Sequence, residues 1–79
     1  MTSAGEQPEF LFKDPSSITG NCPASYRMSR NGRSGMLVQG PQVSPELLAQ
    51  LRDRGADETG VWIPDDLGRL IAKYYTDQG

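Results

Sequence analysis

The sequence predicts a small α+β domain of order ββαβα, in which a three-stranded antiparallel sheet carries two helices on one face. Three observations lead to this fold class. Apolar and polar side chains alternate on both sides of an Asn-Gly pair within residues 24–39. Helix-start residues stand at Ser44 and Pro64, and a short apolar run, residues 59–64, separates the two expected helices. Alternation is typical of half-buried strands, and apolar spacings of three and four are typical of amphipathic helices.

Residues 1–20 are predicted to be a flexible N-terminal tail, and residues 21–79 the α+β domain. Prolines, serines and glycine interrupt any regular period in the tail. Only the run EFLF, residues 9–12, has the composition of a short strand or an anchor. A second interpretation stays open, in which Phe10 and Phe12 dock on the domain or on a partner, because an acidic tail rarely exposes two phenylalanines.

The first two strands are predicted to form a β-hairpin. Asn31-Gly32 is a strong hairpin signal, because a type I′ turn needs positive φ at both central positions. The second strand ends before Pro41, since proline cannot donate to the ladder.

The length of the turn decides which side chains face each other. A two-residue turn places Tyr26 opposite Leu37 and Arg30 opposite Arg33. A longer loop would splay the two arginines apart instead. Two facing arginines repel each other, and no acid lies nearby in the sequence to pair with them.

Two helices and a third strand are predicted after the hairpin. Ser44 is a good N-cap, proline suits the position after it, and Gly55 is a natural C-cap. The run TGVWIP, residues 59–64, is predicted as the third strand and carries Trp62. The last helix opens with Pro64-Asp65-Asp66, where carboxylates favour the positive end of the helix dipole. Its predicted apolar face consists of Leu67, Leu70, Ile71 and Tyr74.

Composition limits both the core and the chemistry. Hydrophobic residues make up only 35% of the 79 residues, so the core must be thin. Cys22 is the single cysteine and histidine is absent, so neither a disulfide nor an ordinary zinc site is expected. A protein partner, or a second copy in a homodimer, is the remaining way to support so thin a core.

A soluble, cytoplasmic protein without membrane contact is expected. The longest apolar runs are three residues, whereas a bilayer-spanning helix needs roughly 20. The first ten residues lack the basic and apolar regions of a secretory signal.

Catalysis is not expected, and no catalytic residue, metal or cofactor is predicted. Without histidine, neither a Ser-His nor a Cys-His nucleophile is available. Asp65 and Asp66 are adjacent helix residues that project about 100° apart, so we interpret them as helix-capping rather than as an acid–base pair. Cys22 fits a small buried hydrophobic side chain better than a reactive thiol, although the second alternative stays open.

The basic stretch is the best candidate binding site. Residues 21–44 hold Arg27, Arg30 and Arg33 and no acid, whereas both flanking segments are net acidic. The predicted partner-binding residues are these three arginines with Tyr26 and Trp62. Three interpretations remain: an acidic protein surface as partner, a nucleic acid bound through the same arginines, or a merely solvated hairpin face. The acidic pI near 4.9 favours a protein partner over nucleic acid.

Three short motifs resemble a known group of proteins. The segments NCPASYR, MLVQG and VWIPDDL are similar to short actinomycete proteins of unknown function with C-P-x-x-aromatic, V-Q-G and I-P-x-x-L motifs. Such proteins are often encoded near helix-turn-helix regulators. The resemblance implies a regulatory accessory that acts through protein–protein contacts, and it assigns no catalytic or ligand residue.

Overall fold

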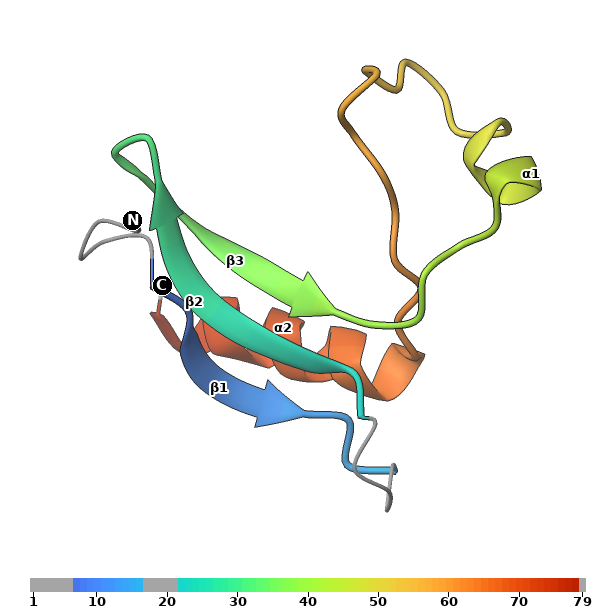
Figure 1. Ribbon diagram of the computed structural model, residues 1–79. Coiled ribbons are helices and arrows are strands. Elements are labelled where there is room, and N and C mark those ends of the chain that lie inside the picture. The colour runs from blue at the N-terminus through green and yellow to red at the C-terminus, as the bar shows by residue number, and fades with distance from the viewer. Residues whose placement is uncertain (1–6, 17–21, 79) are drawn as a thin grey trace.

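The computed structural model describes residues 7–16 and 22–78. This part of the chain holds three strands and two helices: β1 Glu9–Lys13, β2 Ala24–Arg30, β3 Arg33–Gln39, α1 Pro45–Leu48 and α2 Asp65–Gln78. The strands form one antiparallel sheet in the order β1-β2-β3. Helix α2 crosses one face of the sheet, and α1 lies beyond the end of the sheet (Figure 1). The predicted class, an α+β domain with a three-stranded antiparallel sheet and two helices, is therefore confirmed.

The turn between β2 and β3 lies at Asn31-Gly32 as predicted, and of the two lengths left open it is the two-residue turn. Asn31 and Gly32 have φ values of 51° and 78°, so both occupy the left-handed region that a type I′ turn requires. Tyr26 pairs with Leu37 as expected, and Arg30 pairs with Arg33. The Asn-Gly pair therefore sets the register of the whole hairpin.

The third strand is not the one that the sequence predicted. Residues 59–64 contribute only an isolated bridge between Val61 and Gln42, and the sheet is completed by β1, which lies inside the segment predicted as a flexible tail. The element order is therefore βββαα over the described residues. Aromatic contacts explain why β1 completes the sheet. Phe10 lies edge-on to Tyr26 with ring centroids 5.8 Å apart, and the rings of Phe12 and Tyr74 of α2 have centroids 6.4 Å apart.

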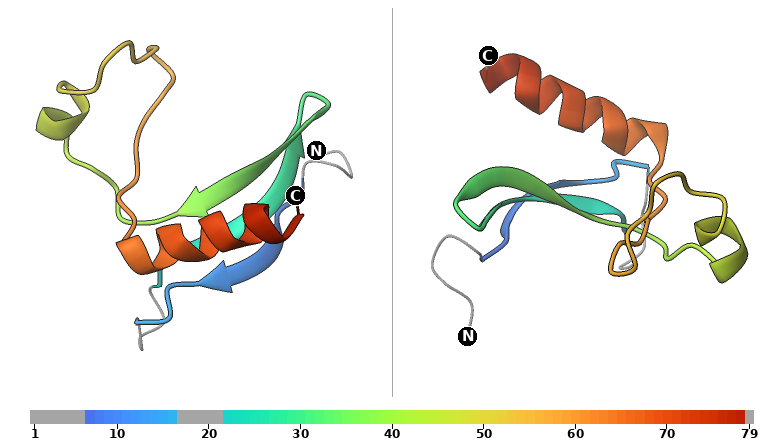
Figure 2. Two further views of the ribbon diagram at one scale, coloured as in Figure 1. Left: turned by 180° about the vertical axis from the view of Figure 1, so that it is seen from behind. Right: turned by 90° about the horizontal axis from the view of Figure 1, so that it is seen from above.

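Helix α1 is a single turn rather than a helix that reaches Gly55. Its start is as predicted, because the Ser44 hydroxyl accepts a hydrogen bond from the Leu47 backbone N–H at 3.2 Å. Leu47 and Leu51 remain 44% and 43% exposed, so the apolar side chains of this segment are only partly covered. Short helices in water depend on the packing of such side chains. The prediction that both helices cover one face of the sheet is wrong, because α1 does not lie on the sheet (Figure 2).

Helix α2 begins after Pro64 and turns its predicted apolar face toward the sheet. Leu67 is completely buried, and Leu70, Ile71 and Tyr74 are half-buried. The only other buried hydrophobic residues in the described part of the chain are Cys22 and Ala24. The core is therefore thin, as the composition indicated, and it centres on one leucine.

Ser25, on β2, is a polar side chain whose burial costs free energy. Its side chain is fully buried, and its hydroxyl has no hydrogen-bond partner among the described residues. An unsatisfied buried hydroxyl costs about 1–3 kcal/mol. We therefore expect Ser25→Ala to raise the free energy of unfolding by about 1 kcal/mol, measured by urea denaturation followed by circular dichroism. Ser29→Ala, at a half-buried position on the same strand, is the matched control and should change little. A clear loss of stability in Ser25→Ala would mean that the hydroxyl does have a partner.

Candidate functional site

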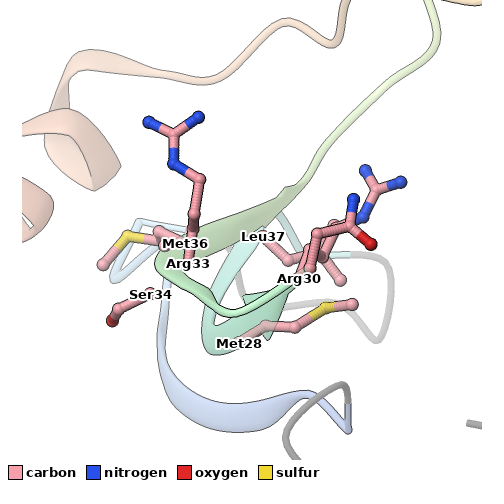
Figure 3. A pocket seen from close by; sticks show the side chains of 8 residues that line it. Met28, Arg30, Arg33, Ser34, Met36 and Leu37 are labelled. Atoms are coloured by element: carbon pink, nitrogen blue, oxygen red, sulfur yellow. The ribbon is translucent and has the colours of Figure 1, made fainter. Parts of the chain in front are cut away.

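The tip of the hairpin carries two arginines without partners, here called the basic tip (Arg30 and Arg33). They are directly paired across β2 and β3, and both are exposed. Neither guanidinium group makes an ion pair or a hydrogen bond with any residue that the structure describes. Their guanidinium groups lie apart (Figure 3). Like charges directly opposite each other weaken a strand pair, so this arrangement does not serve the stability of the hairpin.

A hollow lies beside β3 near the tip of the hairpin, and it is here called the edge hollow. Its volume is about 420 Å³. Residues 34 and 36 project to one face of the sheet and residues 35 and 37 to the other. Residues of both sets line the hollow, together with Met28 and Arg30 of β2. It is lined by Met28, Arg30, Asn31, Arg33, Ser34, Gly35, Met36 and Leu37 (Figure 3).

Gly35 leaves room in this hollow. A Cβ atom built at Gly35 would have one neighbour within 4 Å, the carbonyl oxygen of Met28 at 3.8 Å. The space beside the strand is therefore open on the face that Leu37 and the basic tip share. A larger residue here would fill part of the edge hollow.

The sheet face opposite α2 is apolar, and it is here called the open face (Phe10, Tyr26, Met28 and Leu37). The register places these four residues on the same face. Phe10 is 56% exposed and Leu37 is 44% exposed. Helix α2 lies against the other face (Figure 2). Tyr26 and Met28 are half-buried. A row of exposed and half-buried apolar side chains next to two arginines is typical of a surface that contacts another molecule.

The structure brings together some of the predicted binding residues and separates others. Tyr26 belongs to the open face, and its hydroxyl donates to the Gln39 side-chain oxygen at 2.8 Å. Arg27 projects to the opposite face, where its guanidinium donates to the Tyr74 hydroxyl at 2.9 Å. Trp62 is 59% exposed and lies at the other end of β3. There its backbone N–H donates a hydrogen bond to the Pro41 carbonyl at 3.2 Å. Only Tyr26, Arg30 and Arg33 share the candidate site.

Sequence reasoning did not include Phe10, Met28, Gly35 and Leu37 in the site. Two signals were available. A glycine inside a strand pattern often marks a close approach of another backbone. The alternation of β2 and β3 places Met28 and Leu37 on the same face as Arg30. Phe10 could not be found in this way, because its segment was predicted as tail.

A second cavity of about 410 Å³ lies between the basic tip and the loop that follows α1. Arg30 lines it from the hairpin, and the loop contributes Leu51, Arg52, Arg54, Asp57, Glu58 and Thr59. Some of the polar groups of the loop bond to each other: the Arg54 guanidinium donates a hydrogen bond to the Glu58 backbone carbonyl at 2.6 Å. Two carboxylates line this cavity beside three arginines, so it is less selective for anions than the basic tip.

Comparison with protein-family models, with curated proteins and with solved structures finds no match. Within residues 7–16 and 22–78, no group of three or more metal-ligating side chains comes together. No helix in this part of the chain has the length and apolarity needed to cross a membrane.

Proposed function

We propose that this chain is a non-catalytic, cytoplasmic binding protein that acts through protein–protein contacts. The basic tip meets an acidic surface of the partner, and the open face supplies the apolar anchor beside it. The resemblance to short actinomycete proteins encoded near helix-turn-helix regulators suggests that the partner is a regulator or a component acting with one.

One observation carries this proposal: two exposed arginines face each other, free of any ion pair with the described residues, at the rim of an exposed apolar face. A bound carboxylate would relieve the repulsion between them, and apolar contacts beside it would exclude water. Charge complementarity of this kind sets specificity and association rate, and apolar anchors supply most of the affinity.

A nucleic acid is the second candidate partner, and the placement of Arg27 argues against it. With Arg27 held by Tyr74 on the other face, two arginines remain at the basic tip. Neutralising so few phosphates gives weak binding at physiological salt, on the order of 10⁻⁴ M or weaker.

Charge reversal at the basic tip tests the proposal. The parent and the Arg30→Glu/Arg33→Glu variant would each be immobilised and used to capture proteins from the native cell extract, with and without nuclease treatment. We expect a defined set of proteins to be recovered by the parent in both conditions and to fall at least about tenfold with the variant, equivalent to about 1.4 kcal/mol. Exposed turn residues contribute little to stability, so the variant should stay folded.

The matched control is Arg69→Glu/Lys73→Glu, which makes the same change in net charge on exposed positions of α2. This control should capture what the parent captures. If nuclease removes every specific partner, or if purified DNA or RNA binds the parent at micromolar concentration in physiological salt, the nucleic-acid alternative is correct. If the charge-reversed hairpin captures the same proteins as the parent, the arginines form only a solvated face.

A further inference from the structure

The outer edge of β3 has unpaired backbone groups. In the sheet formed by the described residues, β3 pairs with β2 on one side and with no strand on the other. Antiparallel pairs alternate between hydrogen-bonded and non-hydrogen-bonded, and the pair next to a two-residue turn is hydrogen-bonded. Counting from the pair of Arg30 and Arg33, the backbone N–H and C=O groups of Ser34, Met36 and Val38 point away from β2.

The edge hollow lies beside two of these residues, Ser34 and Met36. Consecutive residues of β3, from Arg33 to Leu37, line it, as they must line a groove for an added strand. Next to Gly35 the hollow has room for a side chain of the incoming strand. Protein edge strands are usually blocked by proline, bulges or inward-facing charges, and Arg33–Gln39 contains no proline and pairs regularly with β2 along its whole length.

The charges around the edge hollow define its occupant. Arg30 and Arg33 line it, and none of its eight lining residues is acidic. On the added strand, the residue opposite Arg33 projects to the face of the basic tip, and so does the residue two positions along, opposite Gly35. The complementary segment therefore carries a carboxylate and, two residues away, an apolar side chain.

We propose that the edge of β3 takes up an extended acidic segment of the partner as a fourth strand, antiparallel to β3 like the other strand pairs of the described sheet, with an apolar side chain of that segment seated beside Gly35. This inference rests on the proposed function and names the form in which the partner binds. Main-chain hydrogen bonds supply the affinity in this recognition mode, and alternate side chains supply the specificity.

A synthetic peptide with blocked ends, ETETLTETE, is the probe. Paired antiparallel to β3, it presents leucine beside Gly35 and glutamates on either side. In that register the threonines oppose Ser34 and Met36, whose N–H groups point outward. N-methylation of the four threonines therefore blocks pairing, whereas N-methylation of the four glutamates is the matched control. We expect fluorescence anisotropy to show at least tenfold weaker binding for the threonine-methylated peptide alone.

The protein side of the same test uses Ser34→Pro. This substitution removes one outward N–H group and leaves the bonds to β2 intact, and proline is accepted at such edge positions. Ser34→Ala keeps the N–H and serves as control, and circular dichroism checks that both variants fold. We expect Ser34→Pro to bind the probe at least tenfold more weakly than Ser34→Ala.

The outcomes separate this inference from the proposed function. If the threonine-methylated peptide binds as well as the parent peptide, antiparallel strand addition is wrong even where the arginines matter. Absence of binding of ETETLTETE at millimolar concentration also overturns it, whereas the proposed function is judged separately by capture with the charge-reversed variant. Should Ser34→Pro fail to fold, the two methylated peptides still decide the question.

Discussion

Leu67→Ala is expected to cost about 3–5 kcal/mol of unfolding free energy, the largest effect of any single substitution considered for this protein. Leu67 is the largest fully buried hydrophobic side chain in the described part of the chain, with 0% of its surface exposed. Deleting its outer atoms removes apolar burial and leaves a cavity between α2 and the sheet. Little other buried apolar surface is present to compensate.

The consequence is large because the domain is small. A chain of this length has a total stability of about 4–12 kcal/mol, so the variant should be largely unfolded at 37 °C or melt far below the parent. Urea denaturation followed by circular dichroism measures the effect. Leu70→Ala is the matched control on the same helix: Leu70 is only half-buried, and its loss should cost about 1–2 kcal/mol. Equal costs for the two variants would show that α2 does not dock through Leu67.

Gly40→Ala is expected to cost about 1–3 kcal/mol through a steric clash. Gly40 is the first residue after β3, and the chain there runs beside the Trp62 backbone. A Cβ atom at Gly40 would collide with the carbonyl oxygen of Trp62. The colliding atom belongs to the backbone, so a change of rotamer cannot relieve the contact.

The same clash should loosen the base of the long loop between β3 and α2. The Trp62 backbone N–H donates a hydrogen bond to the Pro41 carbonyl at 3.2 Å, and Gln42 forms a β-bridge with Val61. We expect Gly40→Ala to accelerate amide hydrogen exchange at Trp62, besides lowering the urea midpoint. Gly68→Ala is the control, because a Cβ there meets open space and alanine favours a helix by about 1 kcal/mol over glycine. If Gly40→Ala matches the parent in both measurements, the two limbs of the loop are not closely packed.

Local chemistry determined the hairpin and the last helix from the sequence alone. Asn31 and Gly32 tolerate positive φ, so they placed the turn, and the two-residue form of that turn pairs Arg30 with Arg33. Proline followed by two aspartates marked the start of α2, and apolar spacing marked the face that meets the sheet. Each of these features depends on interactions between residues close together in the chain.

The candidate site was only partly predictable for the same reason. Alternation along β2 already divided Arg27 from Arg30, although grouping the arginines by sequence proximity concealed this. Only the contact with Tyr74, 47 residues away, showed that Arg27 is occupied on the α2 side. The open face likewise required the pairing of Phe10 with Tyr26 across two strands distant in sequence.

Tertiary packing alone decided which segment completes the sheet and how far α1 extends. The segments 9–13 and 59–64 are both short apolar runs, and nothing in either run states which will pair. Phe10 and Phe12 contact Tyr26 and Tyr74 on the two faces of the sheet, and this favours β1 as the edge strand. Strand and short-helix formation are stabilised mainly by the surfaces that they bury, and those surfaces exist only once distant segments have come together.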